Sequence, residues 1–364
     1  MPDRLPANGE GDVSNQGEVM TQTVLTSLNQ SLHEMMDGDP RVLMMGEDLL
    51  DPYGGAFKVT KGLSERFPER VWTTPISEAG FVGVASGMAM RGLRPVVEIM
   101  FGDFLLLAAD QLVNHAAKFR WMYGDKVDVP LVVRAPMGGY RGYGPTHSQT
   151  LEKHFLGVPG LAVVAIDHLT NPGQMLKKAV IDDDRPVVFI ENKGMYARRL
   201  QPPVNGRIGA MLARQSDGFY PTTTLSFADV PSGDVTIVAY GGMVQMAIDA
   251  AETLLIEDEI YAEVCAPTCL HPMDTGPIAE SIRRTGRLVV CEEASPQAGF
   301  GAEVISRICD EHFEALEAAP LRVGARPMPI ANAKSMEEAI LPGVDDIVEA
   351  VRSNAGRWRT SRSA

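Results

Sequence analysis

Along most of this chain, short runs of apolar residues alternate with longer segments that have helical spacing. The runs at 42–45, 95–100 and 186–191 are rich in Val, Ile, Leu and Met, and they do not alternate with polar residues. Runs of this kind are typical of strands that are buried on both faces, and the segments 78–90 and 104–122 between them are predicted helices. The sequence therefore predicts an α/β fold, in which a parallel sheet is covered by helices on both faces.

The alternation stops once and then restarts. The segment 202–232 is rich in Pro, Gly, Ser and Thr and has little periodicity, which predicts a linker between two domains. Each domain is expected to be a three-layer α/β/α unit. The predicted division of the 364 residues is a flexible leader at 1–17, a first domain at 18–205, a linker at 206–231, a second domain at 232–355 and a tail at 356–364.

Charge and composition exclude several classes of partner. The chain has 33 Lys and Arg against 47 Asp and Glu, a formal charge of −14, which disfavours binding to nucleic acids and anionic membranes. No window reaches ~18 uninterrupted apolar residues, and residues 1–17 lack the apolar stretch of a secretory signal. The four cysteines show no zinc-ligand spacing, which favours reduced thiols. We therefore expect a cytoplasmic protein with no nucleic-acid or membrane partner.

The segment 73–87 is the first candidate for a functional site. Ser77 is suited to cap a helix, and Glu78 then lies in the first helical turn. Gly80, Gly83 and Gly87 share one helix face, where another backbone could approach closely. The residues alone fit two interpretations, because Glu78 could also serve only the helix dipole and the glycines only packing.

The segment 137–149 is the second candidate. It contains four glycines and a proline, follows a predicted strand and ends in His147-Ser148-Gln149. Ligands of α/β sheets bind beyond the carboxyl ends of strands, so a histidine placed there is a candidate proton donor. The alternative is a surface loop with a solvated histidine. The chain has neither glycine-rich fingerprint of nucleotide-binding proteins.

Several motifs, taken together and in order, resemble one family. Glu78 with Gly83, Val84 and Gly87 reads E-x4-G-Φ-x-x-G, which resembles the pyrimidine-binding helix of thiamine-diphosphate enzymes of the transketolase class. Further stretches resemble the β subunit of the decarboxylating component of 2-oxo acid dehydrogenase complexes of the pyruvate and branched-chain type. They are Gly46-Glu47-Asp48, the segments 92–95 and 98–100, Thr146-His147-Ser148-Gln149-Thr150, and the segments 286–290 and 299–303.

The resemblance implies a reaction, a cofactor and roles for five residues. The reaction is the oxidative decarboxylation of a 2-oxo acid such as pyruvate, with reductive acylation of a lipoyl group. The cofactor is thiamine diphosphate, and Glu78 would hydrogen-bond a ring nitrogen of its aminopyrimidine. Phe104 would stack on that ring beside Met100, and Glu47 would lie near the cofactor. His147 would stabilise a developing oxyanion or donate a proton to the lipoyl sulfur.

The resemblance also implies a monovalent cation, K+, held mostly by main-chain oxygens. The ligands would be Leu131, Val180, Ile181, Asp183 and Arg185. Asp183 would supply the single carboxylate. The alternative is that Asp182, Asp183 and Asp184 form only a solvated helix end.

One motif of these enzymes has no match in this chain. Thiamine-diphosphate enzymes hold Mg2+ and the diphosphate with a G-D-G motif and a downstream asparagine, and neither Gly102-Asp103-Phe104 nor Gly124-Asp125-Lys126 fits it. The resemblance therefore implies that an α subunit supplies this half of the site, in an α2β2 heterotetramer. The further partner would be a lipoyl-bearing dihydrolipoamide acyltransferase. The second domain is expected to act mainly in assembly.

Two other functions stay open at this stage. One is the β half of a split, transketolase-type ketol transferase, although the loop offers only Arg141 and His147 for sugar hydroxyls and phosphate. The other is a regulatory subunit with an inactive site, against which the presence of Glu78 argues. The loop residues 140–143 also differ from those of pyruvate and branched-chain enzymes, so the sequence leaves the 2-oxo acid open.

Overall fold

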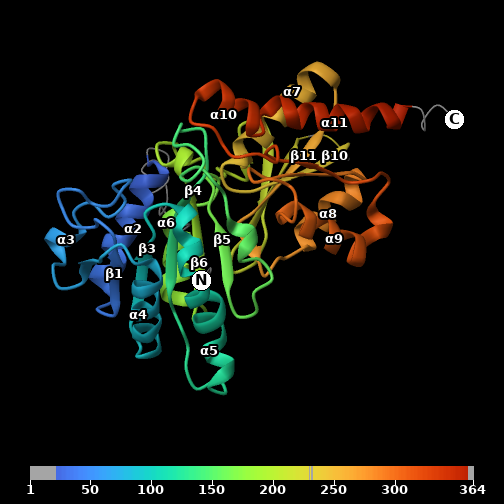
Figure 1. Cartoon of the computed structure of the whole chain (residues 1–364). Coiled ribbons are helices and arrows are strands. Elements are labelled where there is room, and N and C mark those ends of the chain that lie inside the picture. The colour runs from blue at the N-terminus through green and yellow to red at the C-terminus, as the bar shows by residue number, and fades with distance from the viewer. Residues whose placement is uncertain (1–21, 229, 231–232, 360–364) are drawn as a thin grey trace, which may run out of the picture.

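The computed structural model describes residues 22–228, 230 and 233–359. The predicted leader at 1–17 lies outside these residues, as does the end of the predicted tail. Figure 1 shows two halves side by side, one coloured blue to green and the other yellow to red, each built around its own sheet.

The first sheet has seven strands in the order β12-β5-β6-β4-β3-β1-β2. All its neighbouring pairs are parallel except β12–β5, and β12 comes from the C-terminal half of the chain. The strands are β1 (Val42–Gly46), β2 (Val71–Thr73), β3 (Arg94–Glu98), β4 (Val132–Met137), β5 (Ala162–Ala165), β6 (Val187–Asn192) and β12 (Cys269–His271). A strand from the second half of the chain thus completes the first sheet.

Helices cover both faces of this sheet. One face packs against α2 and α6, and the other packs against α4 and the turns that follow β3. The helical elements are α2 (Val24–Gly38), α3 (Leu63–Arg66), α4 (Glu78–Met90), η1 (Gly102–Ala108), η2 (Gln111–Ala116), α5 (Ala117–Met122), η3 (Glu152–His154), α6 (Pro172–Lys177), η4 (Lys178–Asp182) and η5 (Lys193–Met195). The helix predicted at 78–90 has the predicted bounds.

The single helix predicted at 104–122 is instead a 3-10 turn, a π turn and a short α-helix in succession. The 3-10 turn begins at Gly102, two residues before the predicted start. There the buried carboxylate of Asp103 accepts hydrogen bonds from the backbone and side chain of Gln149, at 3.2 and 2.8 Å. This long-range contact anchors the first turn, and the local periodicity of the sequence gives no sign of it.

The second sheet also has seven strands, in the order β14-β13-β10-β11-β9-β8-β7. Its first four strands are parallel and its last three pair antiparallel. The strands are β7 (Arg207–Ile208), β8 (Met211–Gln215), β9 (Thr222–Phe227), β10 (Val235–Ala239), β11 (Ala262–Pro267), β13 (Leu288–Cys291) and β14 (Leu321–Val323).

The predicted linker at 206–231 is therefore not a structureless connection. It contains β7, β8 and β9, which extend the second sheet along one edge. Its Thr and Ser residues suggested a loop, but Thr222, Thr223 and Thr224 are β-branched residues in a strand. β9 lies inside the sheet between β11 and β8, and Thr222 and Thr223 are buried there, so these threonines act as β-branched strand residues.

The helices of the second half complete the three-layer arrangement. The second sheet packs against α7 and α11 on one face and against α8 and α9 on the other. The helical elements are α7 (Met243–Asp258), α8 (Gly276–Thr285), α9 (Phe300–His312), η6 (Phe313–Ala315), α10 (Lys334–Ile340) and α11 (Val344–Arg359). One hydrophobic cluster continues from the α4 face of the first sheet to the α8 and α9 face of the second, so a single core joins the two domains.

The described residues contain no disulfide and no membrane-spanning helix. The cysteines at 265, 269, 291 and 309 are all unpaired, in line with the expected reduced thiols. In the part of the chain that the structure describes, we find no helix with the length and apolar composition that a bilayer span requires.

A buried ion pair network joins the central strands of the first sheet. Arg134 on β4 contacts Glu98 on β3 at 2.5 Å and Glu191 on β6 at 2.7 Å, and all three side chains are buried. The Tyr196 hydroxyl donates a further hydrogen bond of 2.7 Å to Glu191. Burial raises the pKa of Glu98, and the guanidinium of Arg134 opposes this shift. The two carboxylates are tolerable in the core because Arg134 lies between them.

We expect Arg134→Met to reduce the free energy of unfolding by about 3–5 kcal/mol, because it leaves two buried carboxylates without their cation. Urea denaturation monitored by circular dichroism measures this change. Arg120→Met is the matched control, since Arg120 is exposed and its ion pairs with Asp125 and Asp128 lie at the surface. Equal small effects of the two substitutions would contradict the importance of the network.

Candidate active site

The predicted site residues follow four neighbouring strands of the first sheet. Glu47 comes directly after β1, Glu78 begins α4 after β2, Met100 follows β3, and His147 lies in the loop after β4. The strands are parallel, so their carboxyl ends meet at one edge of the sheet. The fold therefore gathers at one edge residues that are 100 positions apart in the sequence.

Glu47 occupies an unusual electrostatic environment. Its side chain is 5% exposed, and its Oε1 is buried without a hydrogen-bond partner. Burial raises its pKa to about 7, and the nearby charges of Glu78 and Asp48 add to the shift. A backbone hydrogen bond from Met100 opposes it. A carboxyl group of this kind is available for a polar ligand and can hold a proton near neutral pH.

Gly46 explains how the chain reaches this position. A Cβ at Gly46 would lie 2.5 Å from the carbonyl oxygen of Glu98 on the neighbouring strand. Only glycine allows β1 to end so close to β3, and this close approach places Glu47 beside the end of β3.

Glu78 lies on the first turn of α4 and is 4% exposed. Phe81, Val82 and Ala85 of the same helix pack into the shared core, whereas Val84 is exposed. Gly80 and Gly87 are also exposed, and a Cβ at Gly87 would meet nothing within 4 Å. A Cβ at Gly83 would lie 3.1 Å from Gln111 Oε1, so the glycine face that the sequence predicted for close approach is open at Gly87 but covered at Gly83.

Aromatic rings surround the imidazole of His147. The centroid of His147 lies 5.3 Å from that of Phe104 and 4.7 Å from that of Phe101, in both cases with the rings edge to face. The hydroxyl of Thr146 lies 3.0 Å from Nδ1 of the imidazole. Sequence reasoning missed Phe101, although its place directly after Met100 at the end of β3 was a usable signal.

Lys193 is a second residue that sequence reasoning missed. It follows β6, its side chain is 0% exposed, and its Nζ donates a 2.8 Å hydrogen bond to the carbonyl oxygen of His147. The ammonium lies 5.3 Å from the centroid of the Phe101 ring. Burial lowers the pKa of Lys193 to about 8. Inspection of the two residues after each predicted strand would have found it.

These residues fit the pyrimidine half of thiamine diphosphate. An aminopyrimidine needs a carboxyl group at a ring nitrogen and a flat apolar surface beneath the ring. Glu78 is a buried carboxyl group, Phe104 is a half-buried ring, and Glu47 has a buried oxygen that lacks a partner. The same edge of the sheet therefore offers each kind of group that the ring requires.

The described residues do not fit Mg2+. Within residues 22–228, 230 and 233–359, no three His, Cys, Asp or Glu side chains form a group that could hold a metal ion. Asp103 is bound by Gln149, and Asp125 forms a surface ion pair with Arg120. Asp103 keeps an unpartnered Oδ2, but neither aspartate of the two near-matches to G-D-G belongs to a group of three such side chains among the described residues.

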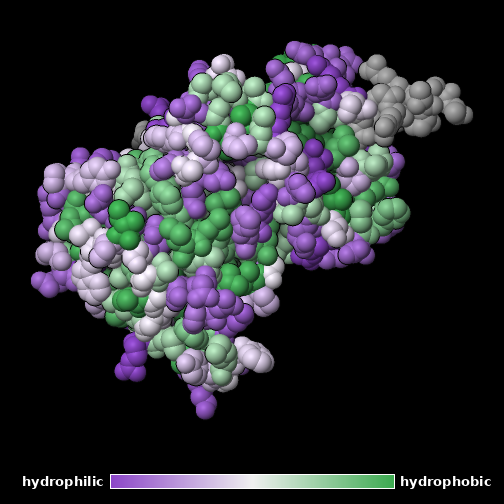
Figure 2. Space-filling model, in the orientation of Figure 1, coloured by the Kyte–Doolittle hydropathy of each residue, from purple (hydrophilic) through white to green (hydrophobic). Residues whose placement is uncertain are grey.

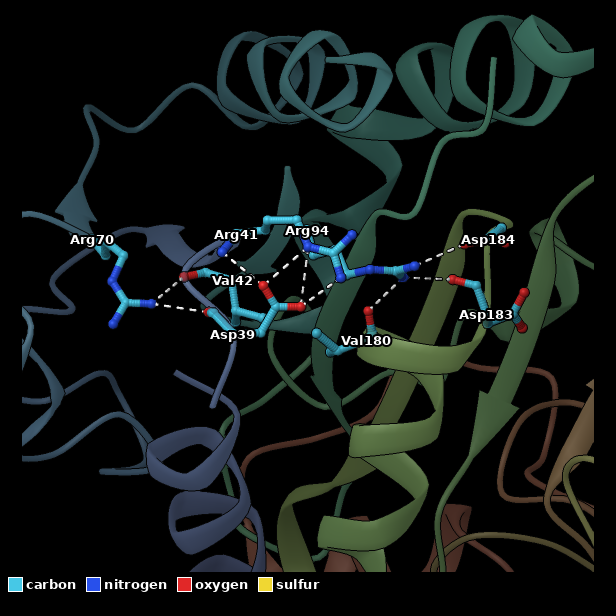
Figure 3. Close-up of polar contacts among 8 residues, drawn as sticks. All are labelled: Asp39, Arg41, Val42, Arg70, Arg94, Val180, Asp183 and Asp184. Atoms are coloured by element: carbon cyan, nitrogen blue, oxygen red, sulfur yellow. Dashed lines mark hydrogen bonds and ion pairs between the residues drawn. The ribbon is translucent and has the colours of Figure 1, made fainter. Parts of the chain in front are cut away.

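Three of the expected K+ ligands, Leu131, Val180 and Asp183, already accept hydrogen bonds from other groups. Arg94 donates from Nη1 to the carbonyl oxygens of Val180 and Asp183, at 2.8 and 3.3 Å, and from Nη2 to Asp184 at 2.9 Å. Figure 3 shows this guanidinium reaching toward all three residues. Arg185 binds the Asp183 carboxylate through Nε and Nη2, at 3.0 and 2.9 Å.

Leu131 and the carboxylates of Asp183 and Asp184 are also bound by other groups. The main-chain oxygen of Leu131 accepts a hydrogen bond of 2.8 Å from Val187 in the sheet. Arg185 pairs with the carboxylate of Asp183, and Arg94 pairs with that of Asp184. The Asp183 carboxylate is thus already paired, and the K+ site stays a prediction from the resemblance.

We expect the stability of the purified chain to depend on pH through Glu47. The pKa of Glu47 rises from 4.5 to about 7 on folding, so the ionised form is disfavoured in the folded state. The wild type should therefore lose stability relative to Glu47→Gln as the pH rises from 4.5 to 7, and the difference should level off above that. Urea denaturation at several pH values measures it. Glu69→Gln, at an exposed position, is the control, and parallel curves for all three proteins would contradict this expectation.

Comparison with known proteins agrees with the two-domain fold described above. The family model "Transketolase, pyrimidine binding domain" matches residues 21–198, and "Transketolase, C-terminal domain" matches residues 228–347. Among solved structures, a "Split gene transketolase, inactive beta4 tetramer" superposes with a TM-score of 0.69, at 22% identity over 91% of this chain and 98% of that one. A transketolase from Leishmania mexicana has a TM-score of 0.63, at 18% identity over 92% of this chain and 46% of that one. At such identities these structures confirm the fold of two α/β/α domains.

Curated relatives are more similar in sequence. The chain is 39% identical to "Pyruvate dehydrogenase E1 component subunit beta-2, mitochondrial" of Oryza sativa, over 91% of this chain and 85% of that protein. It is 40% identical to the corresponding beta-1 subunit of Arabidopsis thaliana, over 90% and 88%. It is 36% identical to the beta subunit of an acetoin:2,6-dichlorophenolindophenol oxidoreductase of Cupriavidus necator, over 91% and 96%. The resemblance seen in the motifs is thus confirmed, and the chain belongs to the transketolase-like family that contains the β subunits of the pyruvate dehydrogenase E1 component.

Proposed function

We propose that this chain is the β subunit of a thiamine-diphosphate-dependent 2-oxo acid dehydrogenase that is active only with an α subunit. The reaction is the oxidative decarboxylation of a 2-oxo acid such as pyruvate, and the two electrons reduce a lipoyl disulfide that receives the acyl group. The observation that carries this proposal is the 39–40% identity to pyruvate dehydrogenase β subunits over nine-tenths of the chain.

The ketol transferase is not favoured. The split-gene transketolase shares 22% identity with this chain, which supports the common fold alone. The loop after β4 contributes Arg141 as its only guanidinium, and Arg141 Nη1 donates to the carbonyl oxygen of Lys193 at 3.1 Å. A sugar phosphate would therefore meet few donors from this loop.

The residues of this chain would bind and orient the pyrimidine half of the cofactor. When bound, thiamine diphosphate supplies the electron sink that allows carbon dioxide to leave a 2-oxo acid. Glu78 would hold a proton at a ring nitrogen of the aminopyrimidine, and Phe104 and Met100 would support the ring. Glu47 would keep its proton near neutral pH because of its raised pKa, and so limit the charge next to Glu78.

His147 would act as the proton donor of the loop. Its Nδ1 lies 3.0 Å from the Thr146 hydroxyl, which leaves Nε2 as the ring nitrogen for the reacting groups. The edge-to-face contacts with Phe101 and Phe104 restrict the tilt of the imidazole. We assign to Nε2 the donation of a proton to the lipoyl sulfur as the disulfide opens.

The α subunit would supply the diphosphate and Mg2+ half of the site. Two observations support this: the described residues of this chain lack a metal-binding group, and apolar side chains on the segments that follow β2 and β3 are exposed. Ile76 is 82% exposed and Leu107 is 59% exposed. Figure 2 shows hydrophobic residues gathered on the visible face of the N-terminal half. Exposed apolar side chains of this kind are typical of subunit contacts, which here would build an α2β2 heterotetramer.

We expect Glu78→Gln to reduce turnover of the reconstituted enzyme by about 10²- to 10⁴-fold, because the amide cannot hold the proton at the ring nitrogen. Steady-state assays of 2-oxo acid oxidation measure the loss. The fold and the affinity for the cofactor should change little, because the substitution keeps the size of the side chain. Glu69→Gln is the control at an exposed position. Turnover near that of the wild type would rule out Glu78 as the acid–base group.

We expect the purified chain alone to bind thiamine diphosphate and Mg2+ very weakly. Ring stacking and one hydrogen bond together contribute about 1–3 kcal/mol, whereas millimolar affinity requires about 4 kcal/mol. Isothermal titration calorimetry on the chain alone tests this. Micromolar binding would reveal a phosphate site within this chain and contradict the division of the site between subunits.

Addition of the α subunit should restore both binding and activity. The reconstituted enzyme is then assayed with an artificial electron acceptor on pyruvate, branched-chain 2-oxo acids and acetoin. Oxidation of a 2-oxo acid supports the proposed function. Activity with acetoin alone would place the chain with the oxidoreductase of Cupriavidus necator instead.

A further inference from the structure

The loop that carries His147 is closed at its base. Residues 138–149, here called the His147 loop, leave β4 and return to it, and the amide of Gly138 donates to the carbonyl oxygen of Gln149 at 3.3 Å. Asp103 holds Gln149 from the neighbouring segment. The two ends of the loop are thus fixed by the N-terminal domain, and the position of its middle depends on other contacts.

The C-terminal domain supplies one of these contacts through Glu293, which follows β13. Its Oε1 accepts a 2.6 Å hydrogen bond from the amide of Gly139, and its Oε2 accepts one of 2.8 Å from the side chain of Asn192. Gly138 has a φ of +100°, and a Cβ there would lie 2.5 Å from Asn192 Nδ2. The chain therefore passes close to the two side chains, and Glu293 joins the loop to the end of β6.

A second contact comes from α10, which Figure 1 shows beside the loop that follows β4. Glu337 is buried and its Oε2 accepts a 3.0 Å hydrogen bond from the amide of Gly142. The hydroxyl of Tyr140 donates to the carbonyl oxygen of Pro342 at 2.5 Å. Tyr140 also packs against the small apolar cluster that contains Ile340 and Leu341. The outer side of the loop thus rests on the C-terminal domain.

The third contact, from Lys193, holds the inner side. Its Nζ donates to the carbonyl oxygen of His147 itself, at 2.8 Å, and lies 5.3 Å from the Phe101 ring and 6.0 Å from the Tyr143 ring. The carboxylates that face it are those of Asp103, Glu293 and Glu337, and the one facing cation is Arg141. A buried ammonium needs such compensation, and here it comes from both domains.

We propose that Glu293, Glu337 and Lys193 form an anchor that positions His147 for its reaction, so that the C-terminal domain acts in catalysis as well as in assembly. The inference rests on the proposed role of His147. The two carboxylates accept hydrogen bonds from two amides of one loop, and the ammonium holds the carbonyl group of the histidine. The three residues are positioning residues, because we place none of them against the reacting atoms.

The anchor predicts a loss in one particular step. In the holoenzyme reconstituted with the α subunit, Glu337→Met should slow acylation of a free lipoyl domain by about 10-fold or more, because small displacements of a catalytic group are costly. Decarboxylation measured with an artificial acceptor should change by less than about 2-fold, because His147 acts after that step. Glu337→Gln keeps an acceptor oxygen and should recover most of the rate. Glu338→Met, on the exposed face of the same helix, should match the wild type.

A double substitution separates positioning from a general structural role. If Glu337 acts through His147, Glu337→Met should cause no further loss of acylation in the His147→Ala background. The same fold-loss in both backgrounds would overturn the proposal. The proposal would also be overturned if the Glu337→Met and Lys193→Met variants both acylated the lipoyl domain at the wild-type rate and kept the wild-type melting temperature.

Hydrogen exchange tests the anchor without reference to activity. Mass spectrometry of the purified chain should show faster exchange of amides in segment 138–149 for Glu337→Met and Lys193→Met than for the wild type or Glu338→Met. Protection equal to that of the wild type in both variants would refute the anchor. If the wild-type holoenzyme fails to oxidise any 2-oxo acid, the proposed function fails, whereas the exchange experiment still decides whether these residues hold the loop.

Discussion

The guanidinium of Arg134, buried between two carboxylates, joins the strands on which the candidate site depends. It ties β4 to Glu98 on β3 and to Glu191 on β6, at distances of 2.5 and 2.7 Å. Each of these strands ends in a segment of the site: β3 leads to Met100 and the aromatic turn, β4 leads to the His147 loop, and β6 leads to Lys193. An error in the relative register of the three strands would displace all three segments at once. The buried charge network, although costly in desolvation, therefore fixes the strands whose relative position the site requires.

Carboxyl groups are concentrated around this edge, and burial raises the pKa of several of them. Burial raises the pKa of Glu47, Glu292 and Glu293 to about 7 in each case. Glu293 is satisfied by two N–H donors and faces Lys193, whereas Glu47 keeps an unpartnered oxygen. This contrast separates two uses of a buried acid. Glu293 organises the backbone around it, and Glu47 remains available for a ligand.

The sequence predicted features that depend on residues close together in the chain, and it missed features that depend on contacts between residues far apart in the chain. The α/β architecture, the bounds of α4 and the placement of Glu78 and His147 at strand ends follow from local patterns and from motifs. The strands β7 to β9 were missed because Thr222, Thr223 and Thr224 suggest a loop by composition, although β-branched residues suit a strand such as β9. The predicted K+ ligands fell on a real cluster of carbonyl oxygens, but Arg94, which is 86 residues from Val180, binds there. Phe101 and Lys193 stand just after predicted strands, which is a local signal, whereas their contacts and that of Glu337 with Gly142 join residues distant in sequence, which no local pattern encodes.

The shared core explains how the C-terminal domain can position a loop of the N-terminal domain. Because one hydrophobic cluster runs from the α4 face of the first sheet to α8 and α9, the two domains cannot rotate against each other without breaking it. The strand β12, donated by the C-terminal half to the first sheet, adds a backbone constraint. Glu293 and α10 can therefore hold a loop of the other domain with fixed geometry, because the surfaces that carry them do not move independently. A site built at such a rigid boundary leaves the open side of α4 and the exposed Ile76 for a subunit that brings the groups this chain lacks.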